Sequence, residues 1–259
     1  MFLTNINTQK EVANNLTVVI LTKNEELNIV SAINNARYVT DNVLIVDSGS
    51  TDRTVEIAEA SGAKVIYRCW DNDFAAQRNF ALEHVDTEWV LYLDADERMS
   101  QELITAIRKT FKNSQKAIYK FIRKNSAFGK TFKYGVLAPD TVLRMFPVSG
   151  VKWHNKVHES PVGDLPIVVL NGFLEHNTYI DFNSYLDKMN LYSTIAAQNY
   201  KLKNRTTNII RDIIFRPLFA FIKMYILKKG FMEGWLGFVL CLTYSSYTLN
   251  KYVKLKLLK

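Results

Sequence analysis

Two aspartates with the spacing of a cation site, Asp94 and Asp96, follow an apolar run at residues 89–93. Such a run is typical of a buried strand, and in open α/β sheets ligands bind at the carboxyl ends of the strands. Two carboxylates on one turn can share a divalent cation, directly or through water, and their oxygens suit Mg2+ or Mn2+ better than zinc. The alternative interpretation is an acidic turn before a helix that Ser100 caps.

Strands and helices alternate on the amino-terminal side of these aspartates. Apolar runs predict strands at residues 16–22, 43–46, 63–67 and 89–93, with a helix after each of the first three. This alternation predicts an α/β fold with a mostly parallel, doubly wound sheet flanked by helices. The sequence holds neither Gly-x-Gly-x-x-Gly nor Gly-x-x-x-x-Gly-Lys, so a dinucleotide fingerprint and a P-loop are both missing.

Polar side chains also follow the first two predicted strands. Thr22, Asn24 and Glu25 follow the first strand, and Asp47 ends the second. Asn24 is predicted to cap the next helix, with Glu25 in its first turn. Carboxylates and amides in such loops can hydrogen-bond a base and a ribose while a metal takes the phosphates. The loops therefore suit a nucleotide.

Four segments together give a specific resemblance. Within residues 16–100, and in this order, they are Ile-Leu-Thr-Lys-Asn-Glu-Glu, Val-Asp-Ser-Gly-Ser-Thr-Asp, Gln-Arg-Asn and Leu-Asp-Ala-Asp-Glu. This set resembles the family 2 glycosyltransferases with the GT-A fold. A looser pattern from Arg144 to His176 extends the resemblance to roughly two thirds of the chain.

The resemblance implies a nucleotide pocket. Thr22, Asn24, Glu25 and Asp47 would line it, with Asp47 near the base, and Arg78 would approach the nucleotide. Two alternatives stay open. Asp47 can serve only the chemistry of its own turn, and Arg78 can be a structural salt-bridge partner.

The resemblance also implies a metal site. Asp94 and Asp96 would form a metal–diphosphate motif that binds Mg2+ or Mn2+, with Asp96 as the direct ligand. His176 could complete this site, as a histidine does in some GT-A enzymes. A histidine that packs near the site without binding the metal is the alternative.

A second group of reactive side chains comprises Trp153, His154, His158 and Glu159. An inverting sugar transfer needs a carboxylate that takes the proton from the acceptor hydroxyl. Glu159, in Val-His-Glu, is the candidate, and the resemblance supports it. His158 could hydrogen-bond the diphosphate or the acceptor, and Trp153 could stack on a sugar ring. A loop histidine and a core tryptophan are the alternatives.

The charge is uneven along the chain. Residues 1–182 hold 20 Lys and Arg against 22 Asp and Glu, net −2, whereas residues 183–259 hold 13 against 3, net +10. We therefore expect a glycosyltransferase domain at 1–182 and a basic helical appendage at 183–259 with an anionic partner. Two cysteines fit a reducing compartment, and the polar residues 1–15 lack the apolar core of a signal peptide, which favours the cytoplasm.

The appendage has the composition of membrane-interface helices. Its apolar runs are broken by charges and by Pro217, or are too short to span a bilayer comfortably. Amphipathic helices on an anionic membrane surface fit better. A helical pair packed on the catalytic domain, a dimer interface and a spanning hairpin are the alternatives.

These features favour a metal-dependent, inverting glycosyltransferase that moves a hexose, glucose from UDP-glucose, to a lipid-linked glycan at the inner face of the cell membrane. The nearest resemblance is to the lipopolysaccharide core β-1,4-glucosyltransferase group. A polyprenyl-phosphate or other envelope-polysaccharide glycosyltransferase is the enzymatic alternative. A basic nucleic-acid-binding protein is less well supported, because the basic residues are interleaved with long aliphatic runs.

Overall fold

The computed structural model describes residues 13–71, 73–113, 116–154 and 159–258, and the chain divides into two compact units. Unit 1 comprises Met1–Arg123 and Thr141–His176, and unit 2 comprises Lys124–Asp140 and Asn177–Lys259. Residues 124–140 thus belong to the same compact unit as the carboxyl-terminal helices. A functional boundary at residue 182 stays a prediction.

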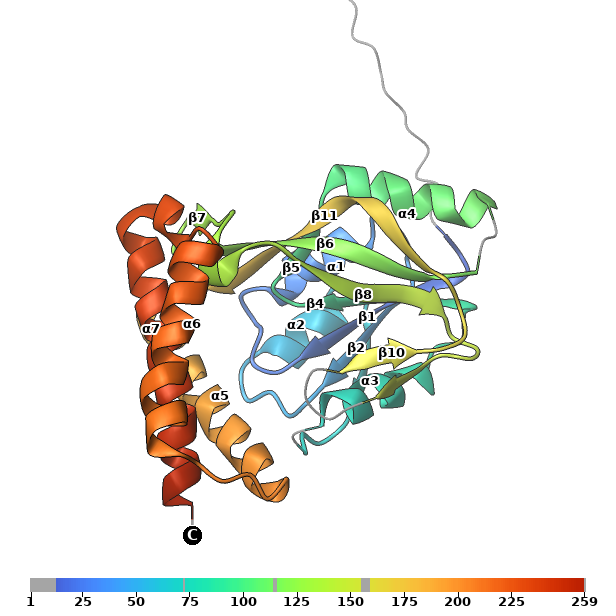
Figure 1. Cartoon of the computed structure of the whole chain (residues 1–259). Coiled ribbons are helices and arrows are strands. Elements are labelled where there is room, and N and C mark those ends of the chain that lie inside the picture. Colours follow the sequence, from blue (N-terminus) through green and yellow to red (C-terminus); the bar gives the residue numbers. More distant parts are fainter. Residues whose placement is uncertain (1–12, 72, 114–115, 155–158, 259) are drawn as a thin grey trace, which may run out of the picture. The chain divides into compact units, whose positions relative to one another are not determined.

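The strands and helices are shown in Figure 1. The strands are β1 Leu16–Thr22, β2 Val43–Asp47, β3 Lys64–Tyr67, β4 Trp89–Asp94, β5 Glu97–Met99, β6 Ile118–Ala127, β7 Lys130–Thr131, β8 Asp140–Pro147, β9 Lys152–His154, β10 Ser160–Val162 and β11 Ile167–Tyr179. The helices of unit 1 are α1 Ile29–Ala36, α2 Thr54–Ala60, α3 Phe74–Leu82 and α4 Gln101–Asn113. Those of unit 2 are η1 Gly135–Leu137, α5 Phe182–Leu202, η2 Ile209–Phe215, α6 Arg216–Ile222, η3 Lys223–Leu227, η4 Gly230–Glu233 and α7 Gly234–Leu257.

The main sheet has the strand order β3-β2-β1-β4-β8-β6-β11-β5, with β7 beside β6. Strands β1 to β4 are the four strands that the sequence predicts, and their neighbours pair in parallel. Beyond β4 the sheet continues with antiparallel pairs, β4 with β8 and β11 with β5. The predicted α/β fold class with a carboxyl-terminal helical part is therefore confirmed.

The central strands are apolar on both faces because both faces are covered. On β1, Val18 and Ile20 pack into a cluster that includes residues of α1 and α4, whereas Val19 packs into a cluster that includes residues of α3. Successive side chains of a strand point to opposite faces, so a strand covered on both sides reads as a continuous apolar run. This explains why the sequence predicts these strands well.

The predicted start of the first helix is wrong. Asn24 does not cap it: α1 begins at Ile29, and Asn24 has a φ of +57°. Asparagine adopts this left-handed conformation more readily than most residues. The backbone N–H group of Glu25 donates to Thr54, and that of Glu26 donates to Asp52. Residues 25–28 therefore form a turn that is bonded to the segment after β2, and they are not the first turn of α1.

Unit 2 is built around two long helices that run in the same direction. Near the start of α5, Tyr185 Oη hydrogen-bonds Thr243 Oγ1, in the first half of α7, at 2.9 Å. Toward its end, Lys254 Nζ lies 2.6–2.8 Å from oxygens of Asn190, Ser193 and Thr194 of α5. Burial of this ammonium group lowers the pKa of Lys254.

The segment of residues 209–227 runs antiparallel to α7, because Ser245 Oγ donates to Pro217 O and Thr207 Oγ1 donates to Tyr252 O. Pro217 lies in the first turn of α6, directly after the π-helical η2. Proline is tolerated there because the first N–H groups of a helix have no partner within it. The predicted break at Pro217 is therefore a change of helix type. In the part of the chain that the structure describes, each helix is too short or too polar to span a bilayer.

Candidate active site

The polar residues at the ends of β1, β2 and β4 lie at one edge of the sheet. Thr22 is the register partner of Asp47, and Leu21 is the register partner of Asp94. Because these three strands are parallel neighbours, their carboxyl ends meet at the edge where open α/β sheets bind ligands. The structure thus brings together the residues that the sequence predicts from three separate loops.

Asp47 closes its own turn. Its Oδ2 accepts the N–H groups of Gly49 and Ser50 at 2.8 and 2.9 Å, and its Oδ1 accepts the hydroxyl of Ser50 at 2.5 Å. Thr22 Oγ1 donates to the same Oδ1 at 3.4 Å, and both Asp47 and Thr22 are buried. Turn chemistry therefore explains these contacts of the Asp47 carboxylate, and contact with a base stays a prediction.

Asn24 and Glu25 fasten the loop after β1 to the loop after β2. Asn24 Oδ1 accepts the N–H of Thr51 at 2.8 Å, and the N–H of Asn24 donates to Ser50 Oγ at 2.9 Å. The N–H of Glu25 donates to Thr54 Oγ1 at 2.7 Å. The two loops are therefore joined by hydrogen bonds, and within them Asn24 is exposed and Glu25 is half-buried.

Asp94 is held by two buried arginines. Arg78 Nη2 donates to Asp94 Oδ1 at 3.2 Å, Arg144 Nη1 donates to the same oxygen at 3.3 Å, and Arg144 Nη2 pairs with Asp94 Oδ2. Partial burial by itself would raise the pKa of Asp94, but the positive charges of Arg144 and Arg78 lower it well below its ordinary value. Asp94 is therefore a carboxylate whose charge the protein itself compensates.

Glu97 completes this group of charges. Its side chain is fully buried and accepts from Arg144 Nη2 at 2.7 Å and from Arg123 Nη1 at 3.3 Å. Its Oε2 also accepts the N–H of Asp94 at 3.1 Å. Burial would lower the pKa of Arg144, yet Asp94 and Glu97 raise it. Buried ions require such partners, because an uncompensated charge is costly there.

Asp96 has a different partner from Asp94, because its side chain lies beside His176. Its Oδ2 lies 3.2 Å from His176 Nε2, with 25% and 12% of the two side chains exposed. The pair arises because β11 runs antiparallel to β5, which puts His176 beside Glu97 in register. No cluster of three or more His, Cys, Asp and Glu side chains suited to a metal occurs in the described part of the chain.

The donor chemistry at Asp96 and His176 nevertheless fits a divalent cation. One carboxylate oxygen and one imidazole nitrogen lie close together, both side chains are partly exposed, and manganese accepts both types of ligand. Cations that act on phosphates are commonly held by one or two carboxylates plus the substrate. Asp94, by contrast, has its oxygens engaged by arginines.

Glu159, directly before β10, reaches the same site. Its Oε1 accepts Arg78 Nε at 3.2 Å, so Arg78 contacts both Glu159 and Asp94. The structural salt bridge that the sequence leaves open for Arg78 is present. Nη1 of Arg78 is buried and makes no hydrogen bond within the described residues.

Trp153 is a core residue in this structure. It is 5% exposed and packs against Tyr92 and Phe146, with the guanidinium of Arg78 4.8 Å from its ring. Its predicted stacking on a sugar stays untested. His154 is exposed. His158 lies outside the described residues.

Sequence reasoning missed Arg144 and Glu97 as members of the site. The available signal was an arginine inside the apolar strand Thr-Val-Leu-Arg-Met-Phe, because a buried arginine requires an acidic partner. Glu97 directly follows the two predicted aspartates and was the nearest such acid. Their pairing depends on β8 lying beside β4, which sequence spacing does not specify.

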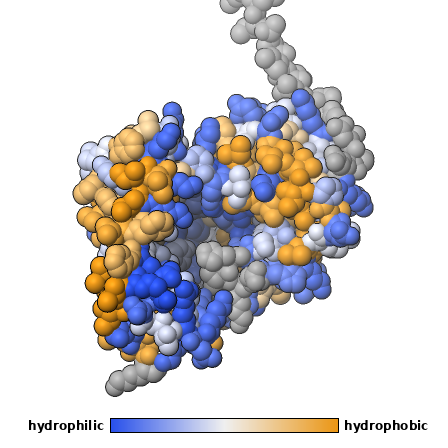
Figure 2. Space-filling model, viewed as in Figure 1, coloured by the Kyte–Doolittle hydropathy of each residue, from blue (hydrophilic) through white to orange (hydrophobic). Residues whose placement is uncertain are grey.

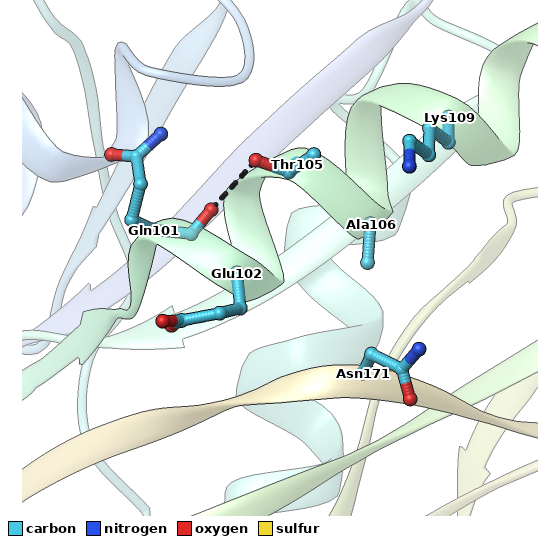
Figure 3. A pocket seen from close by; sticks show the side chains of 6 residues that line it. All are labelled: Gln101, Glu102, Thr105, Ala106, Lys109 and Asn171. Carbon is cyan, nitrogen blue, oxygen red and sulfur yellow. Dashed lines mark hydrogen bonds between the residues drawn. The ribbon is translucent and has the colours of Figure 1, made fainter.

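An open pocket occurs elsewhere in unit 1. Figure 3 shows Gln101, Glu102 and Thr105 of α4 on one side and Asn171 of β11 on the other. The hydroxyl of Thr105 donates a hydrogen bond to the carbonyl of Gln101. None of the residues that line this pocket belongs to the charged group around Asp94, so we do not assign the sugar transfer to it.

Sequence comparison identifies the class of protein. Residues 17–155, more than half of the chain, match the Glycosyl transferase family 2 domain. An uncharacterised glycosyltransferase of Rickettsia typhi is 30% identical over 86% of this chain and 80% of its own length. The glycosyltransferase SunS of Bacillus subtilis is 31% identical over 63% of this chain and 40% of its own length. The chain therefore belongs to glycosyl transferase family 2, whose members use nucleotide-sugar donors.

Among solved structures, glucosyl-3-phosphoglycerate synthase from Mycobacterium tuberculosis, crystallised with Mn2+ and UDP-glucose, covers 44% of this chain and 44% of its own. The sequence identity is 23% and the TM-score is 0.34.

Proposed function

We propose that this glycosyltransferase inverts the anomeric carbon as it moves glucose from UDP-glucose to a lipid-linked glycan, such as the inner core of lipopolysaccharide. Family membership supplies the donor class. The observation that supports a single catalytic site most strongly is the guanidinium of Arg78, which lies 3.2 Å from both Asp94 and Glu159. Glu159, the predicted base, and Asp94 of the predicted diphosphate motif are far apart in sequence, yet both contact the side chain of Arg78.

The donor would lie at the carboxyl edge of β1, β2 and β4. Thr22, Asn24, Glu25 and Asp47 belong to the loops at this edge and would surround the nucleoside. In this arrangement Asp47 acts mainly by holding the loop after β2, since its carboxylate binds two N–H groups of that loop. Trp153 is proposed to stack on a sugar ring, and His158 is proposed to hydrogen-bond the diphosphate or the acceptor.

Asp96 and His176 are the residues that would hold Mg2+ or Mn2+. The cation, when bound, neutralises charge on the leaving diphosphate. Asp94 would act through Arg78 and Arg144, whose positive charges lie beside the same end of β4.

Glu159 would act as the general base. Its carboxylate takes the proton from the acceptor hydroxyl while the oxygen attacks the anomeric carbon from the face opposite to UDP. The bond to the diphosphate breaks on the other face, which inverts the configuration. This role requires an ionised carboxylate within hydrogen-bond reach of the acceptor.

The lipid-linked acceptor is proposed because of unit 2. Residues 183–259 carry a net charge of +10, and their apolar side chains are widely exposed. Figure 2 shows hydrophobic side chains gathered over the carboxyl-terminal helices. The exposed members include Ile210, Phe215, Phe219, Leu227 and Trp235. Such a surface suits the inner face of an anionic membrane.

A panel of donors tests the proposed reaction. Release of the nucleoside diphosphate, UDP or GDP, would be measured for UDP- and GDP-sugars, with and without Mn2+, first with water and then with lipid-linked core glycans as acceptors. We expect UDP-glucose and Mn2+ to give the fastest release, and a glycan product of inverted configuration. Equal rates with GDP-sugars, or a product that retains the configuration, would contradict the proposal.

A further inference from the structure

Three consecutive residues of α3 bind three different parts of unit 1. Gln77 Nε2 donates to Ser48 Oγ at 2.7 Å and to the carbonyl of Arg68 at 2.9 Å. Arg78 binds Asp94 and Glu159, and Asn79 binds the backbone of Trp153. The Gln-Arg-Asn segment therefore joins the loop after β2, the end of β4 and strand β9.

Asn79 fixes strand β9 with a pair of hydrogen bonds. Its Nδ2 donates to the carbonyl of Trp153, and its Oδ1 accepts the N–H of the same residue, both at 2.9 Å. These are the two bonds that a neighbouring strand would make with Trp153. Strand β9 pairs with β10, where Ser160 is the register partner of His154. Glu159 directly precedes Ser160, so the backbone at Glu159 is held through β9 by Asn79.

Arg78 fixes the carboxylate of Glu159. Its guanidinium lies 5.2 Å from the ring centre of Tyr92 and 4.8 Å from that of Trp153, and only 5% of its side chain is exposed. Nη2 is held by Asp94, which leaves Nε to donate to Glu159 in a fixed direction. A planar guanidinium with two anchored nitrogens sets both the distance and the orientation of its partner.

We propose that Arg78 and Asn79 are positioning residues for Glu159. This inference rests on the proposed role of Glu159 as the base. Asn79 places the backbone through β9, and Arg78 aligns the carboxylate with the end of β4, where Asp94 and Asp96 lie. Position matters because a displacement of about 1 Å of a reacting group can cost roughly 100-fold in rate.

A double-mutant cycle tests the inference. The turnover of UDP-glucose, measured as UDP release, is compared for wild type, Asn79→Ala, Glu159→Gln and the double variant. If Asn79 acts through Glu159, Asn79→Ala lowers turnover about 10-fold or more in wild type and less than about 2-fold in the Glu159→Gln background. Coupled residues show such non-additive effects, whereas independent residues are additive.

Asn35 provides a matched control. Its side chain binds the backbone of Met99 in the same way, accepting the N–H at 2.8 Å and donating to the carbonyl at 3.3 Å. Asn35→Ala removes equivalent bonds from β5, and thermal unfolding reports whether the two variants lose comparable stability. The effect of Asn35→Ala on turnover should be the same in both backgrounds.

Arg78→Lys separates positioning from nucleotide contact. Lysine keeps the charge but cannot bind Asp94 and Glu159 with a planar fork. We expect turnover to fall at least 10-fold while the Kd for UDP changes less than 2-fold. A Kd for UDP raised 10-fold would overturn the positioning role of Arg78 and favour direct contact between its guanidinium and the nucleotide.

The outcomes distinguish this inference from the proposed function. Near-normal turnover of Glu159→Gln would show that Glu159 is not the base, and the positioning role would then be rejected as well. Reduced turnover of Glu159→Gln, combined with an equal effect of Asn79→Ala in both backgrounds, would overturn the positioning role alone.

Discussion

At the scale of single residues, the two aspartates after β4 have different surroundings, although they are only two positions apart. Asp94 is bound by Arg78 and Arg144, whereas Asp96 lies beside His176. The Asp-x-Asp pattern indicates two similar oxygen donors. The structure separates them into one carboxylate neutralised by the protein and one that remains suited to a cation.

Substitution of Asp96 tests the proposed metal site. Asp96→Ala should abolish UDP release and Mn2+-dependent binding of UDP, because it removes the carboxylate beside His176. Isothermal titration with Mn2+ and UDP measures the binding, and circular dichroism checks the fold. Asp94→Ala should retain more Mn2+-dependent binding, since Asp94 binds arginines. Full activity of Asp96→Ala would contradict the assignment.

Substitution of Glu159 tests the base. Glu159→Gln keeps the size and the acceptor oxygen that faces Arg78 but removes the basicity. We expect UDP affinity to survive and turnover to fall about 100-fold or more, which is the range for loss of a general base. Steady-state kinetics with UDP-glucose provide the measurement. Near-normal turnover would contradict the assignment of the base to Glu159.

At the scale of elements, the sequence predicts the parallel strands more clearly than it predicts the antiparallel pairings that bring Arg144 and His176 to the site. The strands β1, β2 and β4 are continuous apolar runs, since both faces of the sheet are covered. The residues at their ends could therefore be placed from sequence. The partners of Arg144 and His176 depend on β8 and β11 crossing to β4 and β5, and no local pattern encodes those pairings.

Local preference also failed at the first loop. Asn24 followed by two glutamates has the composition of a helix start, yet its side chain binds Thr51 of another loop. A contact between loops outweighed the intrinsic preference, which is worth only about 1 kcal/mol for a cap. The structure thus departs from the sequence prediction where the candidate nucleotide loops meet.

The packing of β11 against α4 gives a prediction about stability. Gly172 has a φ of +97°, and a Cβ atom there would lie 2.2 Å from the backbone nitrogen of Leu103. Gly172→Ala should therefore destabilise unit 1 by more than about 2 kcal/mol, because the left-handed conformation and the overpacking both cost free energy and backbone cannot move aside as a flexible side chain can. Urea unfolding measures the change.

Gly150→Ala is the matched control for this prediction. Gly150 has a φ of +81°, but a Cβ atom there would meet nothing within 4 Å. This variant pays only the conformational cost of a left-handed residue, about 1–2 kcal/mol. Equal losses for the two variants would show that contact with α4 is unimportant.

The start of η2 gives a prediction about pH. Asp212 is buried and accepts Arg211 Nε at 2.9 Å, Arg216 Nε at 2.6 Å and the N–H of Asn208 at 2.9 Å. The hydrogen bonds from Arg211, with those from Asn208 and Arg216, lower the pKa of Asp212 below its ordinary value of 3.8. A lowered pKa stabilises the fold above pH 3.8, and this contribution is lost as the pH falls through the folded-state pKa.

Asp212→Asn should therefore lower the free energy of unfolding by about 2 kcal/mol at pH 7, the scale of hydrogen bonds to a charged group. The difference from wild type should shrink as the pH falls below about 4. Urea unfolding at several pH values measures it. Asp71→Asn is the control, because Asp71 is solvent-exposed in its pair with Arg68, and such pairs contribute little to the free energy of unfolding. A difference that is independent of pH would contradict the account.

At the scale of the whole molecule, charge and hydrophobic exposure coincide in the same segment. Residues 1–182 have a net charge of −2 and residues 183–259 a net charge of +10. The exposed large apolar residues are concentrated between Ile209 and Leu242. Large exposed apolar patches commonly mark interaction surfaces. A cationic surface with exposed aromatic side chains favours an anionic membrane over a neutral protein partner.

Flotation with liposomes tests this proposal. The full chain should float with vesicles that contain anionic lipid and less with neutral vesicles. Salt should weaken the binding, because the Debye length is only about 8 Å at physiological ionic strength. Buried aromatic side chains should retain part of it at high salt. Equal flotation with both lipids would contradict the electrostatic part of the proposal.

Point variants distinguish a specific membrane-binding surface in unit 2 from non-specific hydrophobic adsorption. Trp235 is 77% exposed in unit 2, and Leu27 is 81% exposed in unit 1, so Trp235→Ser and Leu27→Ser remove equally exposed apolar side chains. Trp235→Ser should reduce flotation severalfold, whereas Leu27→Ser should not change it. Neither variant disturbs a buried contact, so both should keep the melting temperature of wild type. Equal flotation of the two variants, with a dimer in analytical ultracentrifugation, would instead assign this apolar surface to contact between two copies of the chain.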